Sequence, residues 1–491
     1  MKKKFLASAL VCSLLLTLCA ASCTKKNDKK SDLPSDIDPE IIQDDRDSTN
    51  DKETDPVETL PRNNAFDSIP SKDFGGREFV ILTTEPDFCD SEEDKGIIGG
   101  ELYARNRAIE EKFNIKITCV QGDELSIRST LQQDEEQKPD LIYAPQSTIA
   151  YCSGSDLLMN IYSLPYFEYE KEHTQPELLK ALSQSDTSFG IYGDAAYDER
   201  AVWCVYYNKD ILSYLGFVDA FDLVREDKWT WDMFLAIAEG AMLDNDNNRR
   251  FTAGADRFGY SAAMNTSDFA NAVFASFGKT YFSKDEEGFM KMDFAESDED
   301  KYISTLRKIC VEHKAKYPKQ NPGNEAFEAF EKGQLAFFCD KLSTASLLAD
   351  SEVKWGILPM PKLFASDESY HSLVDPSVCG YAVPYGASDS SLSGLVLNAI
   401  YAYNSSYGTD VSEKHWVYHY LPDNTAALGM LEALKTPVYD IAYAFGEGMP
   451  EVSIASYELL HQVTERNVAF SSLYIQNEKP FSDFVRNKFV N

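Results

Sequence analysis

The chain of 491 residues is short of positive charge, with 47 Lys and Arg against 80 Asp and Glu and a formal net charge of −33. A charge of this sign repels phosphate backbones and anionic lipid, so nucleic acid is excluded as an expected partner. Apolar residues make up 43% of the chain, which is enough for a packed core and excludes disorder throughout. At roughly 100–200 residues per domain, the length suggests two or three domains.

The motifs of common catalytic and metal sites are lacking or incomplete. No G-x-S-x-G occurs. Gly278-Lys279-Thr280 lacks the upstream glycine of a phosphate-binding loop, because Val273 stands in its place. His415 and His419 lack the Glu of H-E-x-x-H, which is more typical of a polar helix face than of zinc ligands. We therefore expect no enzyme, although carboxylates paired in space could still make a glycan-active one.

Cysteines are numerous, but they lack the spacing of a disulfide framework or a zinc site. Of the ten, three lie in the first 23 residues, and the remaining seven are odd in number and widely spaced. Several stand inside apolar runs, as in Phe337-Phe338-Cys339, which is typical of buried free thiols. The sequence thus predicts free thiols at Cys89, Cys119, Cys152, Cys204, Cys310, Cys339 and Cys379.

The N-terminus has the features of an export signal. Three lysines at positions 2–4 precede an apolar stretch that runs to about Ala21. Ala20-Ala21-Ser22-Cys23 resembles the lipobox of bacterial lipoproteins, although Ala20 stands where that motif prefers Leu. The resemblance implies a signal peptide over residues 1–22 and acylation of Cys23, with an ordinary secretory signal as the alternative. Two or three acyl chains would give stable membrane anchoring.

Residues 24–72 have the composition of a tether. They contain 13 Asp and Glu, 8 Lys and Arg, five Pro and a single aromatic residue, Phe66. Such a segment cannot bury enough apolar surface to offset the entropy lost on ordering. We expect residues 23–72 to form a lipidated cysteine followed by a disordered acidic tether.

Short apolar runs and amphipathic helices alternate after the tether. Residues 78–82, 115–120 and 140–143 are predicted strands, with a helix over 101–113 between the first two. This alternation predicts an α/β fold with a parallel sheet, in which ligands bind beyond the carboxyl ends of the strands. Thr230 is a predicted helix N-cap. Further strands are predicted over 202–208, 333–338, 353–358 and 378–383, and helices predominate from 392 onward.

Five segments resemble motifs of one family, and they occur in that family's order. They are the helix and strand over 102–115, YYNKDIL (206–212), KWTW (228–231), FEKGQLAF (330–337) and WGILPMPK (355–362). The resemblance is to the family 1 extracellular solute-binding lipoproteins of bacterial ABC importers, the maltose-binding-protein-like class. It implies a two-lobed, type II periplasmic-binding-protein-like α/β fold with a ligand cleft between the lobes. By motif order, lobe one takes 73–185 plus 376–420, and lobe two takes 186–375 plus 421–491.

The function that the resemblance implies is capture of a solute without chemistry. We expect a monomeric, lipid-anchored receptor on the extracellular face of the bacterial cell membrane that closes on a carbohydrate, an oligosaccharide, and serves ABC permease subunits. Contact with the membrane would be through the lipid anchor only. The acidic charge places neutral sugars ahead of cationic solutes and disfavours anionic ones. The alternatives are a surface glycan-active enzyme and a ligand-binding sensor or accessory lipoprotein.

The expected sugar site combines aromatic rings with polar groups, because a ring covers the C–H face of a sugar while carboxylates and amides take its hydroxyls. Core packing is the alternative for each aromatic residue, and Tyr206, Trp229 and Trp231 are assigned to the core. Asp340 is favoured, since a charge after an apolar strand ending at Phe338 must reach solvent or a partner. The candidates are Tyr143, Ser147, Asp194, Trp203, Asp340, Lys341, Asp375 and Tyr381.

A calcium loop is the remaining candidate site. Asp244, Asp246 and Asn248 place oxygen donors at loop positions 1, 3 and 5 after a predicted helix. Position 6 is Arg249 where a calcium loop has Gly, and positions 9 and 12 carry no acid. The segment therefore predicts either a structural calcium site or a solvated acidic turn, and we expect no other cofactor.

Overall fold

The described part of the chain belongs to a single unit that spans residues 58–491. The predicted signal peptide, Cys23 and the tether up to residue 61 lie outside the described residues. None of the helices in the part described is long and apolar enough to cross a membrane. The computed structural model describes residues 62–92, 96–133, 138–263, 266–293, 299–318, 324–408, 416–417, 419–453, 455 and 458–489.

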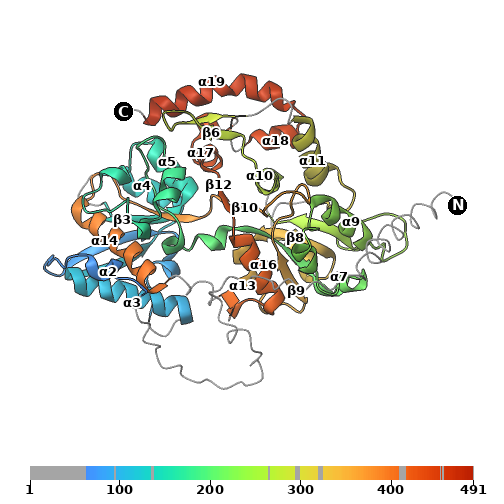
Figure 1. Ribbon diagram of the computed structural model, residues 1–491, viewed down its shortest axis with the longest axis horizontal. Coiled ribbons are helices and arrows are strands. Elements are labelled where there is room, and N and C mark those ends of the chain that lie inside the picture. The colour runs from blue at the N-terminus through green and yellow to red at the C-terminus, as the bar shows by residue number, and fades with distance from the viewer. Residues whose placement is uncertain are drawn as a thin grey trace, which may run out of the picture. The chain divides into compact units, whose positions relative to one another are not determined.

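The first sheet forms the centre of what we call lobe one (Figure 1). Its strand order is β11-β3-β1-β2, with β1 parallel to β2 and β3, and β11 antiparallel to β3. The predicted parallel arrangement of the first three strands is therefore confirmed. The strands are β1 (Arg77–Thr83), β2 (Ile115–Gln121), β3 (Leu141–Pro145) and β11 (Cys379–Ala382), and the main helices are α3 (Gly96–Phe113), α4 (Glu124–Leu131), α5 (Gln146–Gly154) and α14 (Ser390–Tyr403).

The second sheet forms the centre of lobe two and has the order β5-β8-β4-β9. β4 is antiparallel to β8 and β9, while β5 is parallel to β8. The Thr230 hydroxyl accepts a hydrogen bond from the Met233 amide, so the predicted N-cap is confirmed. The strands are β4 (Trp203–Asn208), β5 (Phe258–Ala262), β8 (Leu335–Lys341) and β9 (Trp355–Leu358), and the main helices are α7 (Lys209–Tyr214), α9 (Trp231–Ala241), α10 (Thr266–Ser276), α12 (Glu325–Glu331) and α16 (Asn424–Leu434).

The predicted end of β8 at Phe338 is wrong. The strand continues to Lys341, because its last residues pair with the antiparallel strand β4, and Lys341 lies opposite Trp203. Asp340 therefore belongs to the strand rather than to the loop that follows it. This extension carries Asp340 and Lys341 to the edge of the sheet that faces lobe one.

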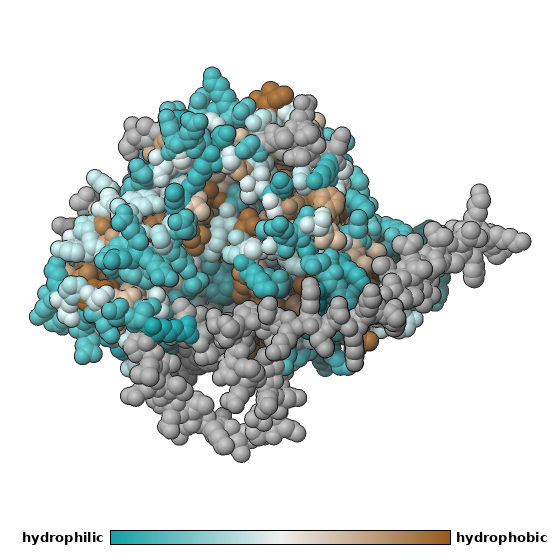
Figure 2. Space-filling view, in the orientation of Figure 1, coloured by the Kyte–Doolittle hydropathy of each residue, from teal (hydrophilic) through white to brown (hydrophobic). Residues whose placement is uncertain are grey.

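Aromatic residues fill the core of lobe two. The rings of Phe234 and Phe337 stack with centroids 4.7 Å apart, and Trp231 packs edge-on against Phe234 at 5.0 Å. Tyr206, Trp229 and Trp231 are buried, which confirms their assignment to the core. The surface is different in character, since hydrophilic residues cover most of the face in Figure 2.

Three backbone segments run between the lobes. Ile191 pairs with Tyr381 on the side of lobe one, and Val202 pairs with Val374 on the side of lobe two. β10 and β12 pair in parallel beside them. The other short elements are α2 (Ala65–Ser68), α6 (Pro176–Leu182), α8 (Asp222–Arg225), β6 (Phe282–Lys284), β7 (Met290–Met292), α11 (Ser304–Arg307), α13 (Ala345–Leu348), β10 (Ser372–Val374) and β12 (Pro437–Tyr439).

The C-terminal helices contact both lobes. α17 (Ile441–Gly448) packs against α5 of lobe one, and Figure 1 shows it between α5 and α10. α18 (Leu459–Thr464) packs against α10, and α19 (Phe470–Phe489) packs against β7. These helices therefore connect the lobes in addition to the three crossing segments.

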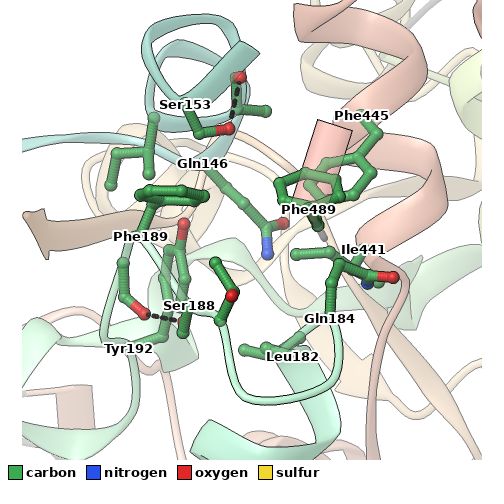
Figure 3. A pocket seen from close by; sticks show the side chains of 14 residues that line it. Gln146, Ser153, Leu182, Gln184, Ser188, Phe189, Tyr192, Ile441, Phe445 and Phe489 are labelled. Atoms are coloured by element: carbon green, nitrogen blue, oxygen red, sulfur yellow. Dashed lines mark hydrogen bonds between the residues drawn. The ribbon is translucent and has the colours of Figure 1, made fainter. Parts of the chain in front are cut away.

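A small cavity lies where α5, the segment before the first crossing, α17 and α19 meet (Figure 3). Its volume is about 30 Å³, room for about one water molecule. Gln146 and Gln184 line it, and the side-chain nitrogen of each has no hydrogen-bond partner among the described residues. The cavity is too small for a sugar.

Residues 62–72, which the sequence assigned to the tether, are folded onto lobe one. Phe66 in α2 is buried, and its ring meets Tyr403 of α14 edge-on at 5.2 Å. The Asn63 side chain donates a hydrogen bond of 3.0 Å to the Ser405 carbonyl. The single aromatic residue of the segment thus attaches its end to the lobe, an interaction that composition alone does not predict.

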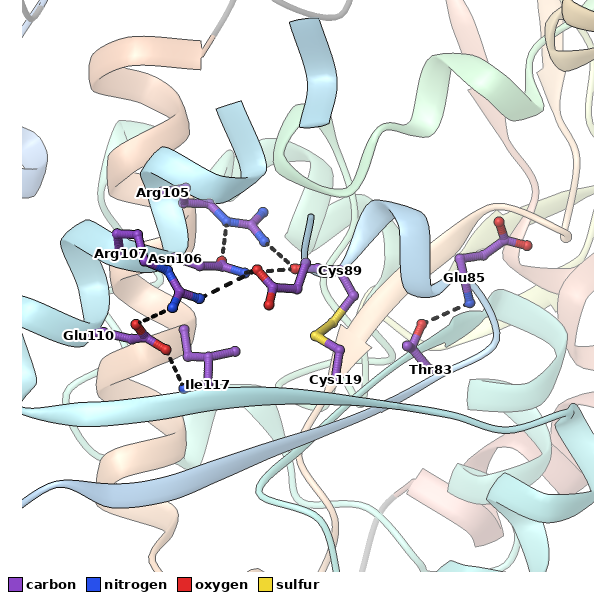
Figure 4. The surroundings of a disulfide bond; sticks show 10 residues. Thr83, Glu85, Cys89, Arg105, Asn106, Arg107, Glu110, Ile117 and Cys119 are labelled. Carbon is purple, nitrogen blue, oxygen red and sulfur yellow. Dashed lines mark hydrogen bonds and ion pairs between the residues drawn. A yellow bond between two sulfur atoms is a disulfide. The ribbon is translucent and has the colours of Figure 1, made fainter. Parts of the chain in front are cut away.

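Cys89 and Cys119 form a disulfide, so the prediction of free thiols is wrong for this pair (Figure 4). The prediction failed because β2 lies beside the loop that follows β1, which brings the two α-carbons within 6.3 Å. The other five predicted free thiols are confirmed, and all are buried.

Replacing both Cys89 and Cys119 with Ser is expected to lower the free energy of unfolding by about 3 kcal/mol, because the crosslink closes a loop of 30 residues in the unfolded chain. Denaturant titration of the two proteins measures the difference. Dithiothreitol should lower the free energy of unfolding of the wild type towards that of the variant. It should leave the free energy of unfolding of the variant unchanged. Equal stability of the oxidised wild type and the variant would contradict the assignment.

Candidate functional site

A polar pocket lies where the carboxyl edges of the two sheets meet, and we call it the interlobe pocket. Its volume is about 210 Å³. One wall comes from the loop after β1, the opposite wall from the end of β8, and the floor from two crossing segments. The lining residues are Glu85, Ala196, Tyr197, Arg200, Ala201, Lys341, Ser343, Ser377, Val378 and Cys379.

The cationic side chains of the interlobe pocket are paired. Arg200 donates to the Glu85 carboxylate at 3.1 Å, and its guanidinium lies 3.4 Å from the centre of the Phe88 ring. Lys341 Nζ donates to Ser377 Oγ at 3.1 Å and lies 3.7 Å from a carboxylate oxygen of Asp375. The pocket therefore presents many donors and acceptors with little uncompensated charge.

The loop that carries Glu85 is fixed from several sides (Figure 4). The Glu85 amide donates to Thr83 Oγ1 at 2.9 Å. Arg105 and Asn106 of α3 donate to the Cys89 carbonyl at 3.1 and 3.0 Å. Together with the disulfide, these bonds hold Glu85 in place opposite Arg200.

The carboxylate of Asp375 positions the Lys341 side chain. Its carboxylate accepts hydrogen bonds from the Trp203 indole at 3.1 Å and from the Ser377 amide at 3.0 Å. The side chain is buried, and its amide donates to the Ala201 carbonyl, so it also joins two crossing segments. Of the sequence candidates, Trp203, Lys341 and Asp375 are thus brought together.

The end of α17 packs against α5, whose Gln146 amide donates to the carbonyl of Val378 in the pocket. A Cβ on Gly448 would lie 2.3 Å from the Ser147 carbonyl oxygen, so only glycine permits this approach to α5. On the other side, the Tyr443 hydroxyl donates to Asp268 of α10. Asp440 caps the helix by accepting hydrogen bonds from the amides of Ala442 and Tyr443. The helix therefore reaches both lobes at their carboxyl edges.

Glu447 projects from this end of α17 and is accessible to solvent. Its pKa is raised from 4.5 to about 7, first by partial burial and then by the neighbouring carboxylates of Asp375, Asp268 and Glu124. The nearby charge of Lys341 acts in the opposite direction. Burial and repulsion between carboxylates therefore both favour the protonated form of Glu447.

The predicted aromatic residues all lie in the core. Tyr143, Trp203 and Tyr381 are completely buried, and the Tyr143 and Tyr381 rings pack at 4.7 Å. The Tyr143 hydroxyl donates to the Ala196 carbonyl at 2.8 Å, which supports the floor of the interlobe pocket. Direct contact of these rings with a ligand stays a prediction.

The remaining candidates lie in three different places. Asp340 is buried and accepts hydrogen bonds from Thr344 Oγ1 at 2.6 Å and the Lys341 amide at 2.8 Å, while burial raises its pKa. Ser147 is buried in the first turn of α5. Asp194 is exposed and lines a separate groove of about 790 Å³ formed mainly by residues 170–181. No lobe-two sheet residue lines that groove.

Sequence reasoning missed several residues of the site. Glu85 lies two residues beyond β1, so the rule that ligands bind at carboxyl ends of strands could have found it. The sequence carries no local signal for the others, because their positions depend on how the crossing segments and α17 pack. The missed residues are Glu85, Arg200, Ser343, Ser377 and Glu447.

The predicted calcium loop brings three carboxylates together. Asp244 and Asp246 lie with Asp256 such that one oxygen of each is within 4.8 Å of the others. Arg249 has φ of +68°, the left-handed backbone for which such loops use Gly. The backbone amide of Asn248 donates hydrogen bonds to the carboxylates of Asp244 and Asp246. The third carboxylate of this group is that of Asp256, and Asn248 stays a predicted ligand.

Glu447→Gln is expected to change how stability depends on pH. Because the pKa is higher in the folded protein, Glu447 contributes stability when protonated, and that contribution is lost as pH rises from about 4.5 to about 7. The variant should therefore gain in melting temperature relative to the wild type between pH 5 and pH 8. Parallel melting profiles across this range would contradict the position assigned to Glu447.

Comparison with known proteins agrees with this architecture. The maltose/maltodextrin-binding domain MalE from Bdellovibrio bacteriovorus, bound to maltotriose, has a TM-score of 0.51 and 13% identity over 84% of this chain and 100% of that one. A cyclo/maltodextrin-binding protein complexed with maltotetraose has a TM-score of 0.53 and 13% identity over 84% and 97%. These likenesses confirm the predicted two-lobed fold. No curated protein matches the sequence.

A family model agrees with the resemblance found in the five sequence motifs. The model described as bacterial extracellular solute-binding protein matches residues 104–425, more than half of the chain. The match includes Arg200, Lys341, Asp375 and Ser377, and so most of the interlobe pocket. The chain therefore belongs to the bacterial extracellular solute-binding protein family.

Proposed function

We propose that this protein is the substrate-binding receptor of an ABC importer and captures a carbohydrate between its lobes without chemistry. The observation that carries the proposal is the interlobe pocket, whose side chains come from both lobes and from the crossing segments. A ligand held there would draw the lobes together, as hinge closure requires. The structural likeness to two maltooligosaccharide-bound proteins gives further support.

The chemistry of the pocket suits a neutral, hydroxyl-rich ligand. Sugar hydroxyls donate and accept hydrogen bonds, and the pairs Arg200–Glu85 and Lys341–Asp375 offer both kinds of group with balanced charge. The volume of about 210 Å³ is below the roughly 300–1,000 Å³ of typical ligand pockets. An oligosaccharide would therefore extend from the pocket towards Glu447 and Asp268.

Membrane anchoring and delivery to a permease complete the proposal. The lipobox-like Ala20–Cys23 supports acylation at Cys23, and the acidic segment after it supports a tether. The site of action would be the extracellular face of the cell membrane, where a family of this kind delivers its solute to permease subunits. A receptor is proposed in preference to an enzyme, because the carboxylates of the pocket are paired with cations.

A linear neutral oligosaccharide is expected to raise the melting temperature without being converted. The protein should be screened by thermal shift against maltotriose, cellotriose, xylotriose and triacetylchitotriose, with a tripeptide as control. Lys341→Met should weaken binding of the best trisaccharide about tenfold, the cost of one charge-assisted hydrogen bond.

Lys354→Met is the matched control, because Lys354 is exposed in lobe two and pairs only with Asp210 among the contacts described. The affinity of this variant for the best trisaccharide should equal that of the wild type. Product formation from the bound trisaccharide, measured by chromatography, would overturn the receptor proposal in favour of an enzyme. Equal affinity of Lys341→Met and wild type would remove the interlobe pocket from the ligand site.

We also propose that the loop from Asp244 to Asp256 binds calcium. Its three carboxylates converge, and a divalent cation would relieve their repulsion. The backbone amides of Asn245 and Thr252 already donate to Asp256, which holds that carboxylate in place.

Calcium at about 0.1–1 mM, the range of weak extracellular sites, should raise the melting temperature of EGTA-treated protein. Asp246→Asn should abolish the rise, because Asp246 is exposed and its loss leaves the buried Asp256 undisturbed. The same melting curve with calcium and with EGTA would show that the loop is a solvated turn.

A further inference from the structure

The C-terminal helix α19 extends from elements of lobe two to lobe one, and Figure 1 shows its C-terminal end above α5. Its body rests on the hairpin β6–β7, which follows α10 of lobe two. The rings of Phe481 and Phe282 lie 5.0 Å apart there, and Arg486 donates to Asp285. The helix also packs against α18, which packs against α10. We call α19 and the hairpin β6–β7 the C-terminal strap.

The last turn of α19 contacts lobe one through two side chains, Lys488 and Phe489, which we call the latch. Lys488 donates to the carboxylate of Asp156, two residues beyond α5, at 2.7 Å. Phe489 is buried, and its ring centre lies 6.0 Å from that of Phe189 and 5.4 Å from that of Phe445 in α17. The latch therefore joins the end of a helix held on lobe two to the surface of lobe one.

The hairpin of the strap contacts lobe one next to the latch. The Ser185 amide donates to the Gly288 carbonyl at 2.9 Å, and the Met290 amide donates to Gln184 Oε1 at 2.9 Å. The strap lies apart from the three crossing segments of the backbone. Lobes that separate about those segments must therefore part from the strap at one of its ends.

Two features make the lobe-one end of the strap easy to release. The small cavity adjoins Phe489, and the side-chain nitrogens of Gln146 and Gln184 line it without a partner among the described residues (Figure 3). Groups that border a void have fewer packing contacts to lose. The Asp156 side chain is 83% exposed, and an ion pair in water contributes little to stability.

We propose that the latch holds the lobes close together and releases lobe one when the cleft opens. The inference rests on the proposed function, because a receptor that closes on its ligand must also open. The interlobe pocket of about 210 Å³ is smaller than typical ligand pockets, so a trisaccharide enters when the lobes separate. The latch contacts exist only while the lobes are close, and they therefore favour the state that retains the ligand.

Small-angle X-ray scattering of the ligand-free protein tests the latch without any ligand. Phe489→Ala removes the ring that packs between Phe189 and Phe445, so the lobes should separate more often. The radius of gyration of this variant should exceed that of the wild type. An unchanged radius of gyration would overturn the proposal.

Calorimetric titration with the best trisaccharide tests the effect of the latch on binding. Lys488→Asp places two negative charges together at an exposed site, and it should weaken binding about threefold because the closed state becomes less populated. Exchanging the charges in the double variant Lys488→Asp/Asp156→Lys should restore the affinity to within about twofold of the wild type. Neither change touches the core, so both variants should fold.

Lys479→Asp is the matched control, since it makes the same charge change at an exposed position of the same helix. It should keep the wild-type affinity and radius of gyration. The proposal is overturned if Lys488→Asp binds as tightly as the wild type or more tightly, if the charge exchange does not restore binding, or if Lys479→Asp weakens binding equally. If no carbohydrate binds the wild type, the proposed function fails, and the radius of gyration of Phe489→Ala alone decides on the latch.

Discussion

The pairing of the backbone where it crosses between the lobes is the constraint on which the site depends. Ile191 pairs with Tyr381 and Val202 with Val374, and β10 runs beside β12. The buried Asp198 joins two of the crossings, because it accepts hydrogen bonds from the Gly193 amide at 2.7 Å and the Tyr439 hydroxyl at 2.8 Å. These bonds hold the carboxyl edges of the sheets towards each other, so residues far apart in the chain converge.

Charge is distributed within the site in a way that the overall composition does not reveal. The cations Arg200 and Lys341 each have a carboxylate partner, and the floor between them consists of backbone and small polar side chains. At the end of α17, the carboxylates of Asp375, Asp268 and Glu124 raise the pKa of Glu447. The net charge of −33 of the whole chain thus does not describe the pocket, whose cations and carboxylates are paired.

The elements of the fold could be predicted from the sequence, since apolar periodicity and the Thr230 cap are local signals. Lys341 and Asp375 could also be predicted as site residues, because they lie at strand ends. The Cys89–Cys119 disulfide was not, since it requires β2 to lie beside the loop after β1. An aromatic residue such as Trp203 looks the same in the sequence whether it packs in the core or contacts a ligand. Glu447 depends on where a C-terminal helix docks, which no local pattern encodes.

The central claim is that the ligand binds between the lobes, next to Lys341 and the end of α17. Hydrogen exchange of the backbone amides, with and without the trisaccharide that gives the greatest thermal shift, tests it most directly. Protection is expected at both pocket walls and at the helix, in residues 196–201, 341–344, 377–379 and 444–448. Protection confined to the groove formed by residues 170–181 would contradict it.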